Sequence, residues 1–596
     1  MVDPSQAYWA YTMDHEDRAA AESRALKVDL EYAFNHAVLR DVQFGFRTTD
    51  RKSSITVPVP SYNWQGVTQP WMLGWKLGQL ATLNDPRFNP AGGTSVHGFD
   101  NFFGGQIAVP AGIYATNPYV KDVNTSYDQL HSYNDVLCNE QKAAQGWGDC
   151  VQWGKNGYKR TAAFGTDPSG ANEIKENTQA FYTQLRFGFD NMAYPVDGNV
   201  GLRYVSTTTK AAGYTVFSSS GTNFPPGVPV TGAKILSIPD FAKAQDFENT
   251  YTNLLPSLNL RMKASDKLQF RFAYAEAMFR PDFSQMQAYT RLSQDVKTTT
   301  DPVTKAINVD SVKLSGESAG NAMLKPVTSK QFDLSAEWYF APAASLTFAV
   351  FDKKLQDIVV TQSSNFAIPD ATGKMQDFAI TSPTNGASGT AKGFEIAYQQ
   401  FYENLPEMLK GFGVQASYTF VDSKRSLYNP VTAAYCSGGD QSNTNFNLWN
   451  NGCDTDGRTF GDLPLQGLSR QTINLALMYE NGPISARLAY NWRSKYLEGV
   501  QNSWGTRFGD ALDTNPNSPD FGKRNVYYAL PLWADSYGQV DASFLYKVTK
   551  DLTVGMEVQN LTNSVFKQVM QQHVGDINHA WIATGPRYSA NLRYTF

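Results

Sequence analysis

Apolar and polar residues alternate along many segments of this chain, and its last segment is the clearest case. Every second residue from Tyr588 to Phe596 is apolar, and the residues between them, from Ser589 to Thr595, are polar. Because successive side chains of a β-strand point to opposite faces, this pattern predicts a strand with one apolar and one polar face. A tilted strand of about 9–11 residues crosses the hydrocarbon core of a bilayer. We therefore expect the apolar face in lipid and the polar face in water.

The same alternation recurs in about fifteen segments, and short and long connections between them alternate strictly. The predicted strands are 23–34, 40–49, 179–189, 199–210, 257–262, 267–277, 331–340, 345–360, 394–401, 413–421, 473–479, 484–492, 540–546, 552–558 and 586–596. A β-sandwich or propeller would space its strands more evenly. The pattern is instead typical of an all-β, antiparallel transmembrane β-barrel, whose periplasmic turns are short and whose extracellular loops are long. The longest predicted loops are 58–172, 281–325, 422–465, 497–532 and 563–585.

Composition excludes two other classes of protein. Charged residues make up 18% of the 596 residues and aromatic residues 13%, and the mean hydropathy is −0.40. A helical membrane protein would need runs of about 18 apolar residues, which the chain lacks. The formal charge of −4 argues against a nucleic-acid partner. Aromatic residues gather near predicted strand ends, as at Trp338, Tyr339 and Phe340, which is typical of the interfacial girdles of a barrel.

The order of short turns and long loops predicts on which side of the membrane the first strand begins. Met1 to Ser5 shows no signal-peptide pattern. If Phe596 lies on the periplasmic side, counting back through short turns and long loops places the start of the first predicted strand outside the cell. We therefore expect residues 1–22 to be the remnant of an extracellular loop and residues 23–596 to be part of a barrel. An intact barrel has an even number of strands, so an odd number would precede residue 1. For a barrel of 22 strands that number is about seven.

Four cysteines form two local pairs, Cys138 with Cys150 and Cys436 with Cys453. Both pairs lie in polar segments rich in Gly and Asn. An even number of cysteines in short loops fits an oxidising compartment and predicts two loop disulfides. The spacings are too wide for a zinc site, and no histidine flanks them.

Tryptophans are the best candidates for ligand contacts. Flat rings stack on sugar faces, and nearby Asn, Asp and Arg side chains bond hydroxyl groups, a combination that ligand sites use. The alternative is ordinary loop packing, in which a tryptophan buries a large apolar area. The tryptophans in predicted loops are Trp64, Trp71, Trp75, Trp147, Trp153, Trp449, Trp504 and Trp581.

Two polar segments contain possible metal ligands, but each has a simpler explanation. His573, His579 and Asp576 share a predicted loop, where a polar outer loop explains them equally well. Residues 454–457, with Asp462 nearby, are similar to a fragment of a calcium loop, yet the full spacing and closing Glu are absent. A turn stabilised by Asp and Gly accounts for that segment. We expect no metal, no cofactor, and no catalytic constellation, so the chain is not predicted to be an enzyme.

Several segments resemble the carboxy-terminal part of TonB-dependent outer-membrane receptors. The likeness is greatest to the large proteobacterial subfamily that is linked to uptake of carbohydrates and complex nutrients. The combination covers nearly the whole chain, and its strongest pair is Asn560 to Asn563 followed by a terminal strand that ends in Phe. The segments are 255–261, 277–284, 324–329, 393–395, 558–563 and 587–596.

This resemblance implies a Gram-negative outer-membrane importer. Such receptors have a plug inside a 22-stranded barrel, bind the TonB complex through the plug, and use the inner-membrane proton gradient. The resemblance also implies that Phe596 is a signal for the barrel-assembly machinery. No plug, TonB box or early strands are recognisable in this chain. The leading expectation is import of a specific nutrient, with an oligosaccharide favoured over a siderophore or iron chelate. A passive porin and a soluble carbohydrate-binding protein or enzyme are the alternatives.

Overall fold

The computed structural model of the chain describes residues 2–15, 17–56, 62–67, 80–102, 105, 108–116, 123–145, 168–218, 224, 227–370, 372–402, 404–429, 434–436, 450–501, 511–518, 521–526 and 528–596. The chain forms two compact units. The first consists of residues 1–20 and 54–172, and the second of residues 21–53 and 173–596.

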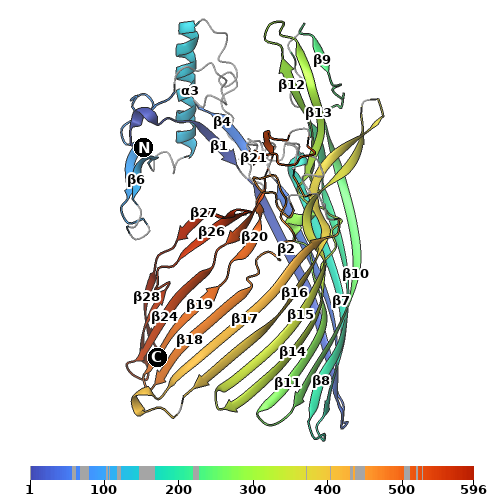
Figure 1. Ribbon diagram of the computed structural model, residues 1–596, viewed down its shortest axis with the longest axis vertical. Coiled ribbons are helices and arrows are strands. Elements are labelled where there is room, and N and C mark those ends of the chain that lie inside the picture. Colours follow the sequence, from blue (N-terminus) through green and yellow to red (C-terminus); the bar gives the residue numbers. More distant parts are fainter. Residues whose placement is uncertain are drawn as a thin grey trace. The chain divides into compact units, whose positions relative to one another are not determined.

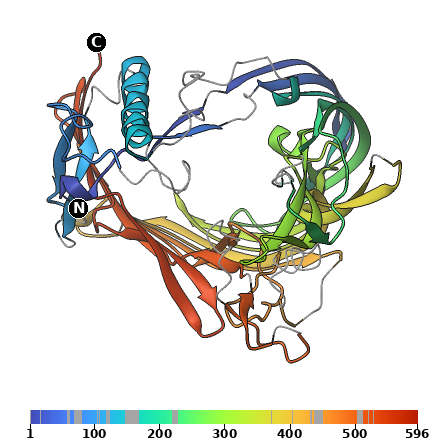
Figure 2. The same cartoon turned by 90° about the horizontal axis from the view of Figure 1, so that it is seen from above.

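The second unit is built on one sheet of 18 strands (Figures 1 and 2). Three of them, β9, β12 and β13, belong to long loops. The other fifteen form a curved wall in which each strand from β7 onward pairs antiparallel with the next. Each of these fifteen overlaps one of the segments predicted from the alternation. In order along the wall they are β2 (Arg18–Ala33), β3 (Leu39–Thr56), β7 (Ala171–Phe189), β8 (Val196–Ser218), β10 (Phe241–Lys263), β11 (Leu268–Phe279), β14 (Val327–Ala341), β15 (Ala344–Pro369), β16 (Met375–Phe401), β17 (Phe412–Leu427), β18 (Gln471–Asn481), β19 (Ile484–Arg493), β24 (Tyr537–Lys547), β25 (Leu552–Gln559) and β28 (Arg587–Tyr594).

The two faces of the wall differ in chemistry. On one face, large apolar side chains such as Leu475, Leu488 and Phe544 are exposed; this is the apolar face. On the other face, charged side chains of neighbouring strands form ion pairs, such as Arg261 with Asp197 at 2.7 Å; this is the polar face. A barrel turns its apolar face to lipid and its polar face to its lumen. The wall therefore has the two-sided character that the alternation predicts.

Several strands are much longer than the alternation indicates. β15 has 26 residues and β16 has 27, whereas about 9–11 residues are enough to cross a bilayer. The alternation predicts a strand that starts at residue 394, whereas β16 begins at Met375. Beyond the apolar zone neither face of a strand needs to be apolar, so the period-two signal fades although backbone pairing continues.

The predicted loop 281–325 is a folded structure rather than an irregular connection. It contains η3 (Phe283–Met286), β12 (Thr290–Thr300) and β13 (Ile307–Ser318), and the two strands pair antiparallel. β12 also pairs parallel with the end of β8, and β13 pairs parallel with β16 and with β9 (Val230–Gly232). Phe217, Leu292, Phe378 and Ile380 form a buried core between these strands. Parallel partners distant in sequence give no local signal, so the alternation could not reveal this structure.

The later loops also contain strands. Four of them form a sheet in the order β20–β23–β26–β27, and two more, β21 and β22, pair with each other. A short turn of 3₁₀ helix, η4 (Glu407–Leu409), connects β16 to β17. The bounds of the six strands are β20 (Tyr496–Gln501), β21 (Ala511–Leu512), β22 (Arg524–Val526), β23 (Leu530–Ala534), β26 (Val565–Gln572) and β27 (Gly575–Ala583).

The first unit departs most from the sequence prediction, which treated 1–22 as a loop remnant and 58–172 as an irregular loop within one barrel domain. These parts of the chain instead form a unit with its own core of Val67, Ala81, Phe88, Tyr133 and Leu137. A search for alternation misses a helix whose apolar stripe is narrow. The elements are η1 (Pro4–Gln6), β1 (Tyr11–His15), β4 (Tyr62–Gly66), β5 (Thr94–Phe99), β6 (Val109–Ala115), α3 (Val123–Gln145) and η2 (Pro168–Gly170).

This unit also contains a buried histidine. His131 on α3 is buried, and the burial lowers its pKa to about 4, so the imidazole is neutral at pH 7. Among the described residues, no helix combines the length and the apolar character that a membrane crossing requires.

Candidate functional site

The structure describes the side chain of only one of the eight candidate tryptophans. Trp581 lies on β27, opposite Lys567 of β26, and is about half exposed. Trp64 is in β4, but its side chain is not among the described ones. The other six lie outside the described residues: Trp71, Trp75, Trp147, Trp153, Trp449 and Trp504.

One of the two cysteine pairs is described. Cys436 and Cys453 are joined by a disulfide bond, with their Cα atoms 6.1 Å apart, and both side chains are buried. Cys138 is in α3 without a described side chain, and Cys150 lies outside the described residues. At the carboxyl terminus, Phe596 is fully exposed and its ring lies edge-on to Tyr594, with centroids 5.0 Å apart.

A cluster of aromatic rings around Arg493 is the strongest candidate for a ligand site among the described residues. The guanidinium carbon of Arg493 lies 4.4 Å from the ring centroid of Tyr496, 5.7 Å from that of Phe566 and 6.0 Å from that of Tyr537. All four side chains are partly exposed. A cation within about 6 Å of a ring centroid is attracted by the ring's quadrupole. We call Arg493, Tyr496, Tyr537 and Phe566 the Arg493 cluster.

The strand register places this cluster on the polar face. Directly paired residues of neighbouring strands share a face. Arg493 pairs with Thr472 and Tyr537, and the same row of pairs continues across the wall to Arg271, Arg261 and Asp197, which form polar-face ion pairs. In a closed barrel the Arg493 cluster therefore faces the lumen.

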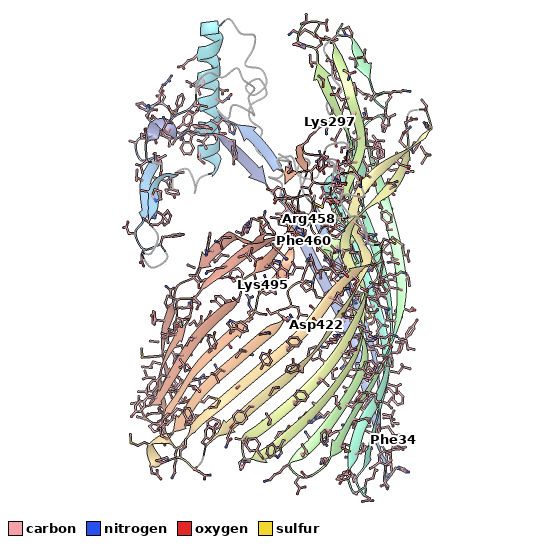
Figure 3. All side chains as sticks on the ribbon, viewed as in Figure 1. Phe34, Lys297, Asp422, Arg458, Phe460 and Lys495 are labelled. Carbon is pink, nitrogen blue, oxygen red and sulfur yellow. A yellow bond between two sulfur atoms is a disulfide. The ribbon has the colours of Figure 1, made fainter. Side chains whose placement is uncertain are left out.

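The elements that hold the cluster meet where β19 ends. Arg493 is the last residue of β19, Tyr537 the first of β24, and Tyr496 the first of β20, while Phe566 comes from β26. β20, β23 and β26 pair side by side, which brings Tyr496 and Phe566 to the same edge of the wall. A second cation lies close by. The Nζ of Lys495 is 5.2 Å from the centroid of the Trp533 ring and 2.9 Å from the Asp576 carboxylate. Lys495 is labelled in Figure 3.

Polar side chains extend from the cluster along the polar face of β24. The Tyr537 hydroxyl donates to Gln539, at 2.7 Å, and Gln539 donates to the Asp541 carboxylate, at 2.6 Å. The same carboxylate accepts from the backbone N–H of Asn560, at 2.9 Å. Asn560 has a left-handed backbone, with φ of 55°, which Asn tolerates better than most residues. The motif at 560–563 therefore fixes the turn that positions Asp541.

This arrangement can bind a ligand that has flat faces and hydroxyl or amide groups. The rings offer apolar stacking surface, and Tyr537, Gln539 and Asp541 offer donors and acceptors within reach of it. The Nη1 of Arg493 is buried and has no hydrogen-bond partner among the described residues. Because Leu488 and Tyr490 lie on the apolar face of β19, the period of two along a strand is enough to place Arg493 on the polar face. The partners on β20 and β26 could not have been found, because those strands fall in segments that the sequence predicts to be loops.

The comparison with protein families agrees with this architecture. Residues 5–561 match the family described as TonB dependent receptor-like, beta-barrel. The chain belongs to this family. TonB-dependent receptor barrels are outer-membrane proteins of Gram-negative bacteria. No curated protein matches the chain in sequence.

Several solved structures of uptake receptors are similar to the chain at low sequence identity. The ferric-catecholate import receptor Fiu of E. coli K12, in its closed form, has 14% identity and a TM-score of 0.44, over 92% of this chain and 51% of Fiu. The ferric yersiniabactin uptake receptor FyuA of Yersinia pestis has 10% identity and a TM-score of 0.44, over 98% and 55%. The siderophore receptor PirA of Acinetobacter baumannii has 12% identity and a TM-score of 0.40, over 97% and 63%. This TonB-dependent receptor chain thus spans between about half and two thirds of the length of these structures.

Proposed function

We propose that the chain is the barrel part of an outer-membrane receptor that imports an oligosaccharide, and that the oligosaccharide binds at the Arg493 cluster. The observation that carries the proposal is the grouping of three aromatic rings and a polar series on the lumenal face of the wall. Rings with a few placed hydrogen-bonding groups are typical of small-molecule sites. In the full-length protein, a plug would gate the barrel and the TonB complex would supply the energy for import.

The charges around the cluster favour a neutral ligand over an anionic one. Two cations, Arg493 and Lys495, are accompanied by three anions, Asp541, Asp576 and Glu498. Lys495 is already paired with Asp576. An anionic ferric chelate would require an excess of positive charge at its site. Hydroxyl groups of a sugar require only the donors and acceptors that Tyr537, Gln539 and Asp541 supply.

The apolar face and the terminal strand fit the remaining partners of the proposal. Exposed Leu, Phe and Tyr side chains on the apolar face would lie against outer-membrane lipid. Phe596 is accessible at the end of the chain, as recognition by the barrel-assembly machinery would require. Outer-membrane lipid and the barrel-assembly machinery are therefore proposed partners, as the TonB complex is.

Replacing Tyr496 by alanine tests the proposed site. We expect Tyr496→Ala to weaken binding of neutral hexose or pentose oligosaccharides about tenfold, a loss of roughly 1.4 kcal/mol, because a stacking surface is removed. Tyr490→Ala is the matched control, since Tyr490 lies on the apolar face of β19, close to the site in sequence. Isothermal titration of the detergent-solubilised chain with each oligosaccharide measures the affinities.

The same titration with ferric complexes of catecholate and hydroxamate chelators separates the ligand classes. Tight binding of a ferric chelate without any oligosaccharide binding would replace the proposed substrate by an iron complex. An equal loss of affinity in Tyr490→Ala and Tyr496→Ala would reject the Arg493 cluster as the site. A steady open conductance of the full-length protein in a planar bilayer would favour a passive porin over an importer.

A further inference from the structure

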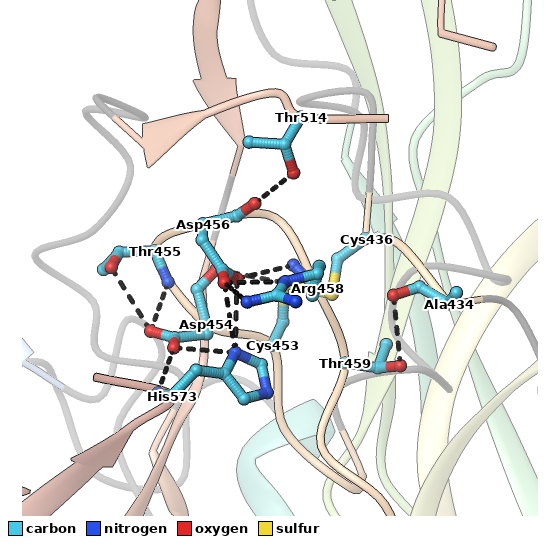
Figure 4. The surroundings of a disulfide bond; sticks show 10 residues. All are labelled: Ala434, Cys436, Cys453, Asp454, Thr455, Asp456, Arg458, Thr459, Thr514 and His573. Carbon is cyan, nitrogen blue, oxygen red and sulfur yellow. Dashed lines mark hydrogen bonds and ion pairs between the residues drawn. A yellow bond between two sulfur atoms is a disulfide. The ribbon is translucent and has the colours of Figure 1, made fainter. Parts of the chain in front are cut away.

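The structure brings together two segments that lie far apart in the sequence, and the sequence pattern of neither predicts a metal site. One is the turn that follows Cys453 and contains Asp454 and Asp456. The other is the connection between β26 and β27, which contains His573 (Figure 4). One ligand atom from each of the three side chains lies within 4.8 Å of the other two. The carboxylates and the imidazole thus converge on one point from segments more than 100 residues apart.

The turn that carries the two carboxylates is firmly held. The disulfide bond ties Cys453 to Cys436, and the backbone of Cys453 pairs with Ala529 and Thr459. The turn then closes through hydrogen bonds between Asp454 and the backbones of Gly457 and Arg458, at 3.0 and 2.9 Å. Asp454 and Asp456 are therefore presented in a fixed relation before any ligand binds, which lowers the entropy cost of binding.

His573 is oriented toward these carboxylates by two contacts. Its backbone N–H donates to Asp454 Oδ2, at 2.5 Å, and its ring stacks on Phe460 with centroids 4.5 Å apart and planes 25° from parallel. Its Nδ1 lies 2.9 Å from Asp454 Oδ2 and 3.3 Å from Asp456 Oδ1. Arg458 and Phe460 are labelled in Figure 3, in the loops beside the wall.

The charge of Asp454 is a second, independent indication of a ligand. Its side chain is only 3% exposed; among the described residues it accepts hydrogen bonds from Thr455 and from the backbone N–H of His573, and its ion-pair partner is the His573 ring, which is charged only when protonated. Asp456, by contrast, is bound by the Arg458 guanidinium at 2.6 and 2.8 Å, through Oδ2. Burial of a carboxylate without a cation is costly. A bound metal ion would supply the positive charge that His573 supplies only when it is protonated.

From this geometry we infer a binding site for a divalent transition-metal ion of the zinc type, held by Asp454, Asp456 and His573 Nδ1. Metal–ligand bonds of about 2.0–2.2 Å at tetrahedral angles place ligand atoms roughly 3.3 Å apart. The separations of 2.9 and 3.3 Å between Nδ1 and the carboxylate oxygens are close to this value. Calcium is a poorer fit, because it takes six to eight oxygen ligands and no imidazole.

The ion would add a link between two loops that already contact each other through the Phe460–His573 ring pair and through hydrogen bonds from Gln572 to Thr455 and from His573 to Asp454. It would join the disulfide-bonded turn to the β26–β27 connection, and β26 also carries Phe566 of the Arg493 cluster. Three protein ligands leave the fourth position of a tetrahedral ion open to solvent or to a further ligand. The inference stands on the geometry of these three residues and does not depend on the proposed oligosaccharide substrate.

The test measures binding of zinc chloride and cobalt chloride to the untagged chain in detergent. We expect one zinc ion per chain with micromolar or better affinity, and visible absorption bands of tetrahedral Co²⁺ when cobalt is bound. His573→Ala should weaken zinc binding at least 100-fold and abolish those bands. His579→Ala removes an exposed imidazole from the same β26–β27 hairpin and should change neither measurement.

Circular dichroism of each variant confirms that the barrel is folded, and Asp456→Asn provides a second ligand variant if His573→Ala disturbs the loop. The inference is overturned if no zinc binds at micromolar concentration. It is equally overturned if zinc binds to His573→Ala as tightly as to the parent chain, or if only calcium binds and His573→Ala has no effect on it.

Discussion

Replacing Glu176 by alanine is expected to lower the free energy of unfolding by about 3 kcal/mol, because it removes the buried anion between two partly buried arginines. The Glu176 side chain on β7 is only 1% exposed. Its carboxylate lies 3.0 Å from Arg280 Nη1 and 3.3 Å from Arg51 Nε. Neither carboxylate oxygen of Glu176 has a well-aligned hydrogen bond among the described residues. The buried carboxylate is therefore stabilised by its attraction to the two guanidinium groups. Urea unfolding of the protein in detergent, followed by tryptophan fluorescence, measures the change.

An exposed ion pair on the adjacent strands is the control. Glu248 on β10 lies 3.3 Å from Lys210 on β8, and both side chains are about 60% exposed. An exposed pair contributes less than about 1 kcal/mol. We therefore expect Glu248→Ala to have little effect. If Glu176→Ala were as mild as Glu248→Ala, the triad of Arg51, Glu176 and Arg280 would not stabilise the wall.

Gly393→Val is expected to destabilise the sheet by about 3 kcal/mol, because the new side chain cannot be accommodated without a shift of backbone. A Cβ atom at Gly393 on β16 would lie 1.9 Å from the carbonyl oxygen of Phe420 on β17, and 3.0 Å from the Phe351 ring. The oxygen belongs to the paired β16–β17 ladder, so it cannot move without breaking hydrogen bonds. Urea unfolding of the refolded variant measures the shift of the unfolding midpoint. A variant that does not refold into detergent would show the same destabilisation.

Gly461 provides the matched comparison for this variant. A Cβ atom at Gly461 would meet no atom within 4 Å, and its backbone is not left-handed. Gly461→Val is therefore expected to leave the unfolding midpoint nearly unchanged. Equal midpoints for the two variants would show that the approach of β17 to β16 at Gly393 is not tight.

The wall could be predicted from the sequence because lipid and water impose a period of two on every crossing strand. Leu488 and Tyr490 are apolar and Arg487 and Asn491 are polar for this reason alone, without knowledge of any partner strand. All fifteen wall strands follow from such local patterns. Their outer extensions do not, since residues beyond the apolar zone, such as 375–393 of β16, need not alternate.

The candidate sites could be predicted only in part, because each combines residues from separate loops. Asp454 and His573 were each recognised as possible ligands, but their meeting depends on the packing of two loops, which has no period in the sequence. Arg493 ends a predicted strand, whereas Tyr496 and Phe566 reach it through β20 and β26. The tryptophan hypothesis remains a prediction for all eight residues, and the side chains of seven of them are not described.

The central claim is that one face of the wall meets lipid and the other meets water. Nitroxide labels at cysteines introduced one at a time at Arg487, Leu488, Tyr490 and Asn491 of β19 test it most directly, with the protein reconstituted in lipid vesicles. We expect labels at Leu488 and Tyr490 to be relaxed mainly by oxygen, which dissolves in lipid, and labels at Arg487 and Asn491 mainly by a water-soluble nickel chelate. Equal accessibility at all four positions, or the reverse assignment of the two faces, would contradict the account.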